Sequence, residues 1–507
     1  MDKRRSILNI STSIVSRVVL LVSALVVRRL LIHYIGNDVN GLNSLYTSII
    51  GMLGVAELGI GSAIVFSMYS PIVLGDRKKV AALYSLYRKL YLIIGLVIFG
   101  AGLAVMPFLP ALISDYDKIC VDVHGTFFLT LVSVVLSYGY SAKTSLIEAH
   151  KDNYITTGIL TIGSLVRYCL QAVAVLLWAS YPAFLACQII GTAVVWLLTE
   201  LAVRRKHGDI IRQREKVDDA TKKEISRNVK AMVMHRIGTV LVHGVDSMII
   251  SGFIGVVILG KYSNYNYVAG IVAGIIGLFF TPLTSIVGHL CAAGDREEIK
   301  RSFDHFYILN YVLGFIFFLG YFAVVDGVIV LLFGPGLEVT RPVAFVITLN
   351  QFTQYMRNAG LLFRNASGTF YNDRWKPVAE GVINLLLSLL FVKVFPEEYK
   401  VVGVIAATII TTLVICNTVE PYVIFRHVFG RSPKAFYLRH YAYTGLFACA
   451  LFVMARIVHP YDSEIRGILV NGFLSVGLSI GMLCLVFLVD RGFRTEVQII
   501  GRKLLHL

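Results

Sequence analysis

Long apolar stretches dominate the sequence, and the first of them, residues 10–35, is long enough to cross a bilayer as a helix, for which about 20 apolar residues suffice. The whole chain of 507 residues is 56% hydrophobic and 15% charged, whereas soluble domains are roughly a quarter charged. The sequence therefore predicts an all-α polytopic membrane protein. We expect fourteen spans, over residues 10–35, 42–66, 88–113, 124–148, 154–178, 182–203, 231–254, 262–290, 303–333, 342–370, 377–395, 401–425, 437–457 and 466–489.

The positions of the basic residues predict the orientation of these spans. Most of the 47 Lys and Arg residues lie in every second predicted loop, and the intervening loops hold only Lys118, Lys261, Arg341 and Lys400. Cytoplasmic loops are the ones enriched in Lys and Arg. Both termini are therefore expected in the cytoplasm, and the net charge of +16 needs no nucleic-acid partner to explain it.

Three arginines, Arg17, Arg28 and Arg29, interrupt the first apolar stretch. Each would cost roughly 2.5–3.5 kcal/mol if it faced lipid at the centre of the bilayer. At about 100° per residue, Arg17 and Arg28 lie within roughly 20° of one another around the helix. Two interpretations stay open. Either this wall of the helix faces water or an anion, or the side chains extend toward the two membrane surfaces.

A shift of 219 residues aligns the first half of the chain with the second. It carries Arg17 to Arg236, Gly36 to Gly255, Gly41 to Gly260, and Gly75-Asp76-Arg77 to Gly294-Asp295-Arg296, and a shift of 221 aligns Lys143 with Arg364 and Asp152 with Asp373. Internal repeats are typical of secondary transporters, which bind substrate between the repeats. We expect two six-helix lobes with pseudo-two-fold symmetry, 1–203 and 231–428, a cytoplasmic linker 204–230, and a C-terminal part 429–507 with two further spans and an amphipathic cytoplasmic tail.

Polar and ionisable side chains inside the predicted spans are the candidate site residues, because charge within a membrane is usually functional. Arginines outnumber the clearest central acids, which favours an anionic guest, and the planar guanidinium binds phosphate oxygens in pairs. Gln and Tyr side chains suit a neutral sugar portion. The candidate cavity residues are Arg17, Arg28, Arg167, Arg236, Arg357, Gln354 and Tyr140, and the candidate coupling or gating residues are Glu57, Asp246 and His243.

Sequence motifs for other chemistries are missing. The seven cysteines form no CxxC pair, the twelve histidines include no HExxH, and no GxxxxGK[ST] occurs. The sequence therefore predicts no catalytic residue, no metal site and no cofactor.

The arginine-bearing first helix, the spaced glycines after it and the run Glu57-Leu58-Gly59-Ile60-Gly61-Ser62-Ala63 resemble the Wzx-type polysaccharide flippases. This family belongs to the multidrug/oligosaccharidyl-lipid/polysaccharide (MOP) exporter superfamily. The resemblance implies a MATE-like fold and export of oligosaccharide linked to undecaprenyl pyrophosphate across the bacterial inner membrane by alternating access. The cargo would be an O-antigen, capsule or exopolysaccharide repeat unit. Coupling to Na⁺ or H⁺, and partner polymerases or glycosyltransferases, are further expectations of the resemblance.

Two other functions compete with this one. A MATE-type cation antiporter would share the fold, but cationic drugs call for carboxylates and the arginine excess opposes them. A membrane glycosyltransferase or polymerase is suggested by Asp115-Tyr116-Asp117, a DxD-like pair in a predicted outer loop. The outer loops, at roughly 5–12 residues, are too short to build a glycosyl site of their own.

Overall fold

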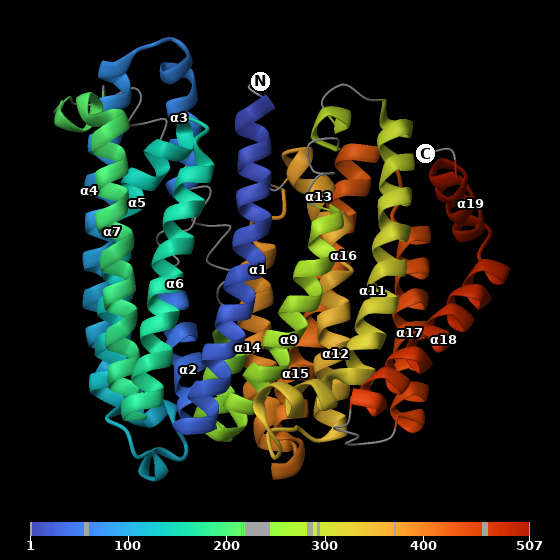
Figure 1. Ribbon diagram of the computed structural model, residues 1–507. Helices are drawn as coiled ribbons and strands as arrows, with labels where there is room; N and C mark the ends of the chain where they lie inside the picture. Colours follow the sequence, from blue (N-terminus) through green and yellow to red (C-terminus); the bar gives the residue numbers. More distant parts are fainter. Residues whose placement is uncertain are drawn as a thin grey trace. The chain divides into compact units, whose positions relative to one another are not determined.

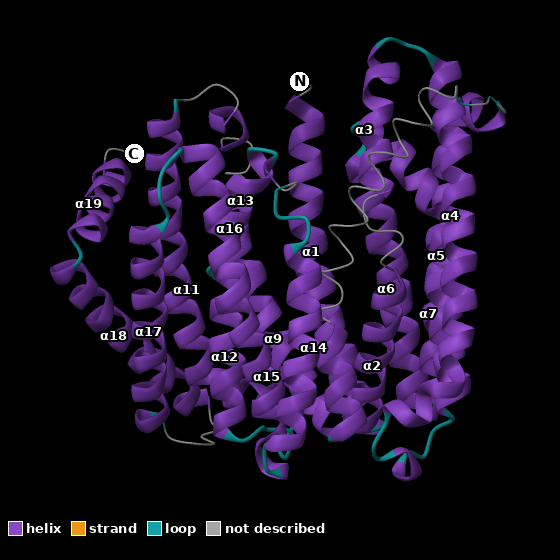
Figure 2. Ribbon diagram, turned by 180° about the vertical axis from the view of Figure 1, so that it is seen from behind, coloured by secondary structure: helices purple, strands orange, loops and turns teal. Residues whose placement is uncertain are grey.

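The computed structural model describes residues 3–54, 60–213, 215, 217, 244–280, 287–291, 295–369, 372–458 and 465–505. These residues form helices and connecting segments, with no strand among them (Figures 1 and 2). Within this part of the chain, nine helical segments are long and apolar enough to cross a membrane. The prediction of an all-α polytopic membrane protein is confirmed.

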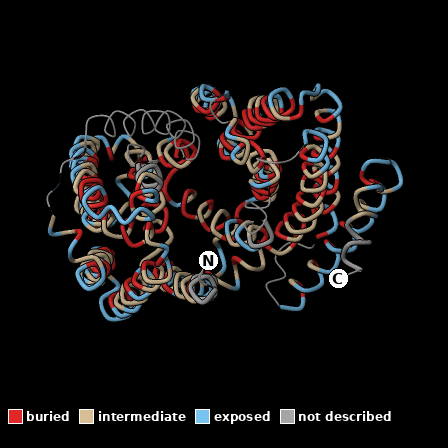
Figure 3. Tube along the Cα trace, turned by 90° about the horizontal axis from the view of Figure 1, so that it is seen from above, coloured by how far each residue is buried: buried red, intermediate tan, exposed pale blue. Residues whose placement is uncertain are grey.

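The chain divides into two compact units, Met1–Gly260 and Lys261–Leu507. In each unit, the buried residues lie where helices face one another (Figure 3). The boundary falls within helix α9, so the first residues of α9 belong to unit 1. The lobes expected from the sequence, 1–203 and 231–428, stay a prediction.

Unit 1 is a bundle in which α4, α5, α6 and α7 run side by side and α1 packs on α6 (Figures 1 and 2). A short apolar helix, Gly244–Phe253, also belongs to this unit. Its elements are α1 (Lys3–Tyr34), α2 (Asn37–Leu53), α3 (Ile60–Val73), α4 (Arg77–Val105), the 3₁₀ turns Met106–Leu112 and Tyr116–Lys118, α5 (Val123–Ala149), α6 (Asn153–Trp178), α7 (Tyr181–Arg212) and the start of α9 (Val256–Phe280).

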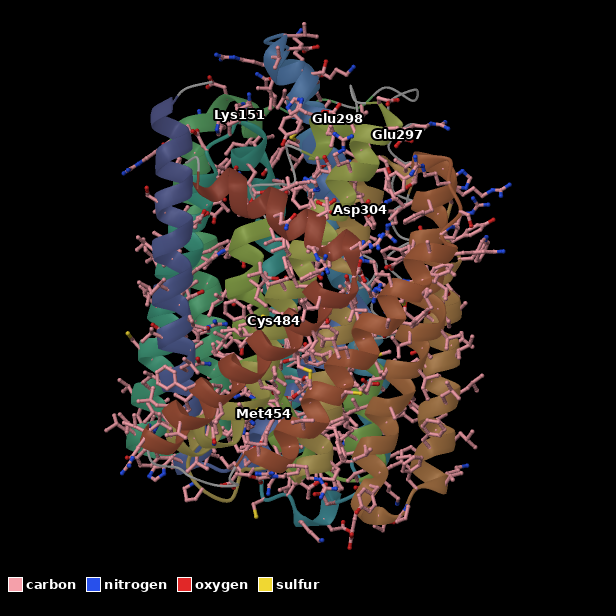
Figure 4. The ribbon with its side chains drawn as sticks, turned by 90° about the vertical axis from the view of Figure 1, so that its right-hand side faces the viewer. Lys151, Glu297, Glu298, Asp304, Met454 and Cys484 are labelled. Atoms are coloured by element: carbon pink, nitrogen blue, oxygen red, sulfur yellow. The ribbon has the colours of Figure 1, made fainter. Side chains whose placement is uncertain are left out.

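Unit 2 is organised around α11, which contacts α12, α13, α17, α18 and α19. Glu297 and Glu298 lie near one end of α11 and Asp304 further along it (Figure 4). The elements are α11 (Arg296–Phe333), α12 (Arg341–Tyr355), α13 (Asn358–Ala366), α14 (Lys376–Val394), the 3₁₀ turn Glu397–Tyr399, α15 (Lys400–Thr411), a π turn at Thr412–Cys416, α16 (Asn417–Ile424), a second π turn at Phe425–Phe429, α17 (Lys434–Ile457), α18 (Ile465–Val489) and α19 (Arg491–Leu505).

The C-terminal helix α19 packs on its own unit at its start. Phe493 is 3% exposed and lies against the rings of Tyr311 and Tyr443. The carboxylate of Asp490 just before it bonds Arg439 at 3.1 Å. The sequence pattern predicts an amphipathic tail, and the structure shows that its first apolar residue contacts protein.

The two halves of the chain end their first helices in the same way. Gly36 follows α1 with φ 136°, and Gly255, at the 219-residue shift, precedes α9 with φ 129°. Each glycine donates its N–H to the carbonyl five residues earlier, at Leu31 and Ile250. Because this backbone conformation favours glycine over any residue with a Cβ, the paired glycines of the sequence mark equivalent helix ends.

Side-chain contacts also recur at equivalent positions. A polar pair links the fourth span to the sixth in the first repeat and the tenth to the twelfth in the second, and an ion pair further along the same spans does the same. At shifts of 220 or 221 residues, the polar pair Ser133–Thr192 (3.3 Å) corresponds to Gln354–Thr412 (2.8 Å). The ion pair Lys143–Glu200 (2.5 Å) corresponds to Arg364–Glu420 (3.9 Å). The repeat therefore extends from the sequence to the internal contacts of each unit.

A reciprocal close approach joins the start of α2 to the start of α9 within unit 1. A Cβ placed on Gly41 would lie 1.9 Å from the carbonyl oxygen of Val256, and one on Gly260 would lie 2.4 Å from that of Asn37. The Asn37 amide donates to the carbonyl of Val257 at 2.8 Å. Small residues permit helix backbones to approach in this way within membranes.

We predict that Gly41→Ala destabilises the protein, because the new methyl group overlaps a backbone carbonyl. Overpacking of this kind costs about 1–3 kcal/mol. Gly51→Ala on the same helix is the matched control, since a Cβ there meets no atom within 4 Å, and it should be neutral or slightly stabilising because alanine favours helix. Thermal unfolding in detergent should show a lowered midpoint for the first variant alone. Equal midpoints would contradict the close approach.

Candidate functional site

Helix α1 presents three distinct stripes around its axis. Ser16, Val27 and Leu31 are buried, whereas a stripe of valines is more than half exposed. Arg17 is exposed and Arg28 is half-buried, and at about 100° per residue they lie roughly 135° from the centre of the valine stripe. The exposed valines are Val15, Val18, Val22 and Val26. Arg17 and Arg28 therefore lie on one side of α1, away from its exposed apolar stripe.

Helix α6 adds a further arginine to the α1–α6 pair. The two helices contact one another, and the Thr161 hydroxyl bonds that of Ser16 at 2.8 Å. Arg167 on α6 is half-buried, and its Nε is buried without a hydrogen-bond partner among the described residues. Neither α1 nor α6 contains an Asp or Glu. This helix pair is therefore purely cationic in its own charges.

The other predicted site residues of the first half are distributed as follows. Tyr140 is half-buried on α5, and Asp246 is buried, 6% exposed, on the helix Gly244–Phe253. Gly244 of that helix lies against Met52 of α2, so Asp246 belongs to unit 1. Arg236, Glu57 and His243 lie outside the described residues. The coupling or gating roles predicted for Glu57, Asp246 and His243 stay predictions.

Unit 2 contains a buried group of ionised residues, which we name the ion cluster. Its centre is Glu420, 1% exposed. The Arg357 guanidinium donates to both oxygens of Glu420, at 2.7 and 3.2 Å, and the Lys376 ammonium donates to it at 2.7 Å. The full ion cluster is Arg357, Arg364, Asp373, Lys376, Glu380 and Glu420.

The ion cluster is balanced in charge. Arg364 pairs with Asp373 at 2.6 Å, and Lys376 also bonds Glu380 at 3.1 Å, so three cations meet three carboxylates. Burying a charge in a low-dielectric interior is tolerable only with such pairing and full hydrogen bonding. The cluster therefore balances its own charges without an added ion, although Arg364 Nε and Asp373 Oδ1 have no hydrogen-bond partner among the described residues.

Arg357 and Gln354, two of the predicted cavity residues, are brought together by the structure. The Arg357 guanidinium donates to the Gln354 side-chain oxygen at 2.6 Å, and the Gln354 amide donates to Thr412 at 2.8 Å. The bidentate donor geometry expected to bind phosphate is thus directed at Glu420 in this structure. Arg357 stays a candidate cavity residue, but a phosphate would have to compete with a carboxylate already bound there.

Helix irregularities place the members of the ion cluster. The tenth predicted span is not continuous, because α12 ends at Tyr355 and α13 begins at Asn358, with Arg357 between them. The twelfth contains the π turn Thr412–Cys416 just before Glu420. A π turn inserts a residue and rotates the helix that follows. The break and the turn together bring Arg357 and Glu420, 63 positions apart, within bonding distance.

Two members of the ion cluster, Glu380 and Glu420, were missed at the level of sequence. Both lie inside predicted spans, 377–395 and 401–425. The rule that singled out Glu57, that an acid inside a membrane span is functional or paired, applies to them equally. Including Glu380 and Glu420 among the acids within the predicted spans balances the arginines of the second half.

Asp115, the first acid of the DxD-like pair, has a structural role. Its carboxylate accepts a hydrogen bond at 3.1 Å from the backbone N–H of Val256, the first residue of α9. An acidic side chain at a helix N-terminus satisfies a free donor and interacts favourably with the helix dipole. This contact explains Asp115 without a glycosyltransferase site.

We predict that Glu420→Gln strongly destabilises the protein, because Arg357 and Lys376 would lose the carboxylate that both contact. Removing one partner of a buried ion pair costs about 3–5 kcal/mol. Glu397→Gln is the matched control, since the Glu397 side chain is 81% exposed. Adding Lys376→Gln to Glu420→Gln should recover part of the loss, which unfolding of the single and double variants would measure. Equal effects of the two Glu variants would contradict the ion cluster.

Comparison with known proteins establishes the fold. No protein-family model and no curated protein sequence matches the chain. Among solved structures, the lipid II flippase MurJ in an inward closed conformation aligns with 95% of this chain and 99% of its own, at 13% identity and a TM-score of 0.64. An inward-facing multidrug resistance MATE transporter of the MOP superfamily aligns over 78% and 92%, at 12% identity and a TM-score of 0.58.

A third similar structure is a point mutant of the Vibrio cholerae MATE transporter VcmN. It covers 85% of this chain and 100% of its own at 13% identity, with a TM-score of 0.54. The MATE-like fold expected from the sequence is confirmed: the chain has the fold shared by the MOP-superfamily transporters MurJ and MATE.

Proposed function

We propose that this protein is a membrane transporter of the MOP type that exports an oligosaccharide linked to undecaprenyl pyrophosphate across the bacterial inner membrane. The cargo would be an O-antigen, capsule or exopolysaccharide repeat unit. Transport would proceed by alternating access around a cationic surface that includes Arg17, Arg28 and Arg167. In this proposal the protein is a flippase without catalytic residues, and both termini are cytoplasmic.

The single observation that carries the proposal is the acid-free helix pair α1–α6. Arg17, Arg28, Arg29 and Arg167 lie on two contacting helices without Asp or Glu, whereas the arginines of the ion cluster in unit 2 are matched by carboxylates. In their own side chains, α1 and α6 therefore contribute only positive charge to the spans. Such a surface favours an anion over the cations that drug antiporters carry.

A pyrophosphate suits this surface for two reasons. Its several oxygens accept the paired donors of more than one guanidinium, so a single head group offsets the desolvation of several arginines. The protein named lipid II flippase, to which the chain is similar over nearly its full length, carries by that name a lipid-linked cargo. Tyr140 and the Arg236 counterpart of Arg17 are proposed as further contacts.

Coupling of transport to Na⁺ or H⁺ is proposed to involve Asp246, His243 and Glu57. Asp246 is the buried acid of unit 1 among these. Its position corresponds to Val27, next to Arg28, at the 219-residue shift. Polymerases and glycosyltransferases that make and consume the lipid-linked glycan are the proposed partners.

The first test of this function is the substitution of Arg17. We predict that Arg17→Ala abolishes flipping of a fluorescent undecaprenyl-pyrophosphate-linked oligosaccharide in proteoliposomes, while Arg17→Lys restores part of it because a point charge replaces a planar two-donor group. Arg301→Ala, which removes an exposed arginine of α11, is the matched control and should flip normally. Undiminished flipping by Arg17→Ala would refute the role of the α1 arginines.

The same preparation separates the flippase from a drug antiporter. Undecaprenyl pyrophosphate should compete with the labelled lipid, whereas ethidium, a cationic drug, should neither compete nor be transported. Transport of ethidium with no effect of undecaprenyl pyrophosphate would favour the MATE-type function.

A further prediction concerns Arg28 and Asp246, which we propose to form an outer gate. If Arg28 alternates between Asp246 and the substrate phosphate, the charge swap Arg28→Asp with Asp246→Arg should leave folding intact and stop export, because the cation then lies on the wrong helix. If the two residues form a static bridge, the swapped protein should export at the wild-type rate. The flipping assay and the unfolding midpoint together decide between these outcomes.

A further inference from the structure

Unit 1 carries a basic groove on α4, α5 and α7, separate from the α1–α6 arginines. It is a cavity of about 690 Å³ in which four cations face one acid. Glu200 is already bonded to two of these cations, Lys143 at 2.5 Å and Arg204 at 2.6 Å. We name as the basic groove the residues Tyr84, Arg88, Lys143, Trp196, Leu197, Glu200, Arg204, Gly208, Ile211 and Arg212.

The basic groove lies where two apolar stripes end. On α4, Arg88 precedes Leu92 and Leu96, which are 64% and 61% exposed, at successive four-residue steps. On α7, Leu197 is 59% exposed and Arg204 follows it by two helical turns. Exposed leucines on membrane helices face acyl chains, and the change from leucine to arginine marks the level of the lipid head groups. Trp196, half exposed, is a residue typical of that level.

The second repeat shows what covers the equivalent surface there. The 219-residue shift carries Tyr84 to Phe303 and Arg88 to Tyr307, and both are buried under α17. Phe436 of α17 lies 4.9 Å from the Tyr307 ring, and the Tyr307 hydroxyl bonds His440 at 2.9 Å. At these two positions the second repeat is thus aromatic and meets a helix, whereas the first places Arg88 in a cavity.

We propose that the basic groove binds the phosphate of an anionic phospholipid from the cytoplasmic leaflet, with its acyl chains along the exposed leucines of α4 and α7. Arg88, Arg212 and the terminal N–H groups of Arg204 supply the donors to the phosphate, while Lys143 and the Arg204 Nε pair with Glu200. Basic pockets between membrane helices on the cytoplasmic side are suited to such head groups. A free phosphate would use the same cations but gain nothing from the apolar stripes. The phospholipid proposed for the basic groove is a bound ligand of the protein and is distinct from the exported cargo.

The test compares two lipids on the full-length purified protein. Native mass spectrometry with phosphatidylglycerol and with phosphatidylcholine of the same acyl chains should show a preference for phosphatidylglycerol. Arg88→Gln combined with Arg204→Gln should reduce that preference about tenfold or more, because two cations at the membrane surface are lost. Lys78→Gln with Lys79→Gln is the matched control: it removes the same charge from exposed positions of α4 outside the groove, and should change the preference less than twofold.

Two further measurements use Arg88→Lys and inorganic phosphate. Arg88→Lys retains the charge and should retain the lipid, which separates a charge effect from a folding defect, and unchanged unfolding midpoints verify that the Gln variants fold. Inorganic phosphate at millimolar concentration should not displace the lipid. Equal binding of the two lipids, equal loss in the Lys control, or displacement by phosphate would each overturn the proposal. Lipid retention is measured without transport, so its failure would leave the proposed export function standing.

Discussion

A positive charge inside a membrane protein must meet either a carboxylate or a ligand, because the surrounding medium cannot solvate it. The helices of the two units differ in the acids that they supply beside their arginines. In unit 2, Glu420 accepts from Arg357 and Lys376, and the remaining members complete a balanced set. In unit 1, α1 and α6 bring arginines together with no acid on either helix. The anion-binding role that we propose for α1 and α6 follows from this difference in the charges that the helices themselves carry.

Because the chain contains an internal repeat, its two halves can keep one architecture and still place their charges differently. Equivalent pairs such as Lys143–Glu200 and Arg364–Glu420 maintain the same helix contacts in both halves. Around them the charges have diverged. Position 88 is an arginine in a cavity, while its counterpart Tyr307 is buried beneath α17. The shared contacts preserve the fold, and the surrounding positions are where each repeat acquires its own ligand or neighbour.

Hydropathy and the paired glycines were enough to predict the membrane class, the helical fold and the repeat, because these depend on local pattern and on chemistry that the sequence states directly. The neighbours of Arg357 could not be predicted in the same way. They depend on a helix break at Met356–Arg357 and on the π turn Thr412–Cys416, which no periodicity in the sequence marks. The tail shows the same limit: its pattern predicts an apolar face, but not that Phe493 packs against Tyr311.

The crossing of α2 and α9 at Gly41 and Gly260 has a mechanical consequence. The backbones touch here, so the carbonyls of Asn37 and Val256 leave no room for a side chain at either glycine. The side-chain amides of Asn37 and Asn40 donate to carbonyls at the start of α9. Steric contact therefore prevents the two helix starts from moving closer, and the hydrogen bonds oppose their separation. Within unit 1, the start of α9 is clamped to the start of α2.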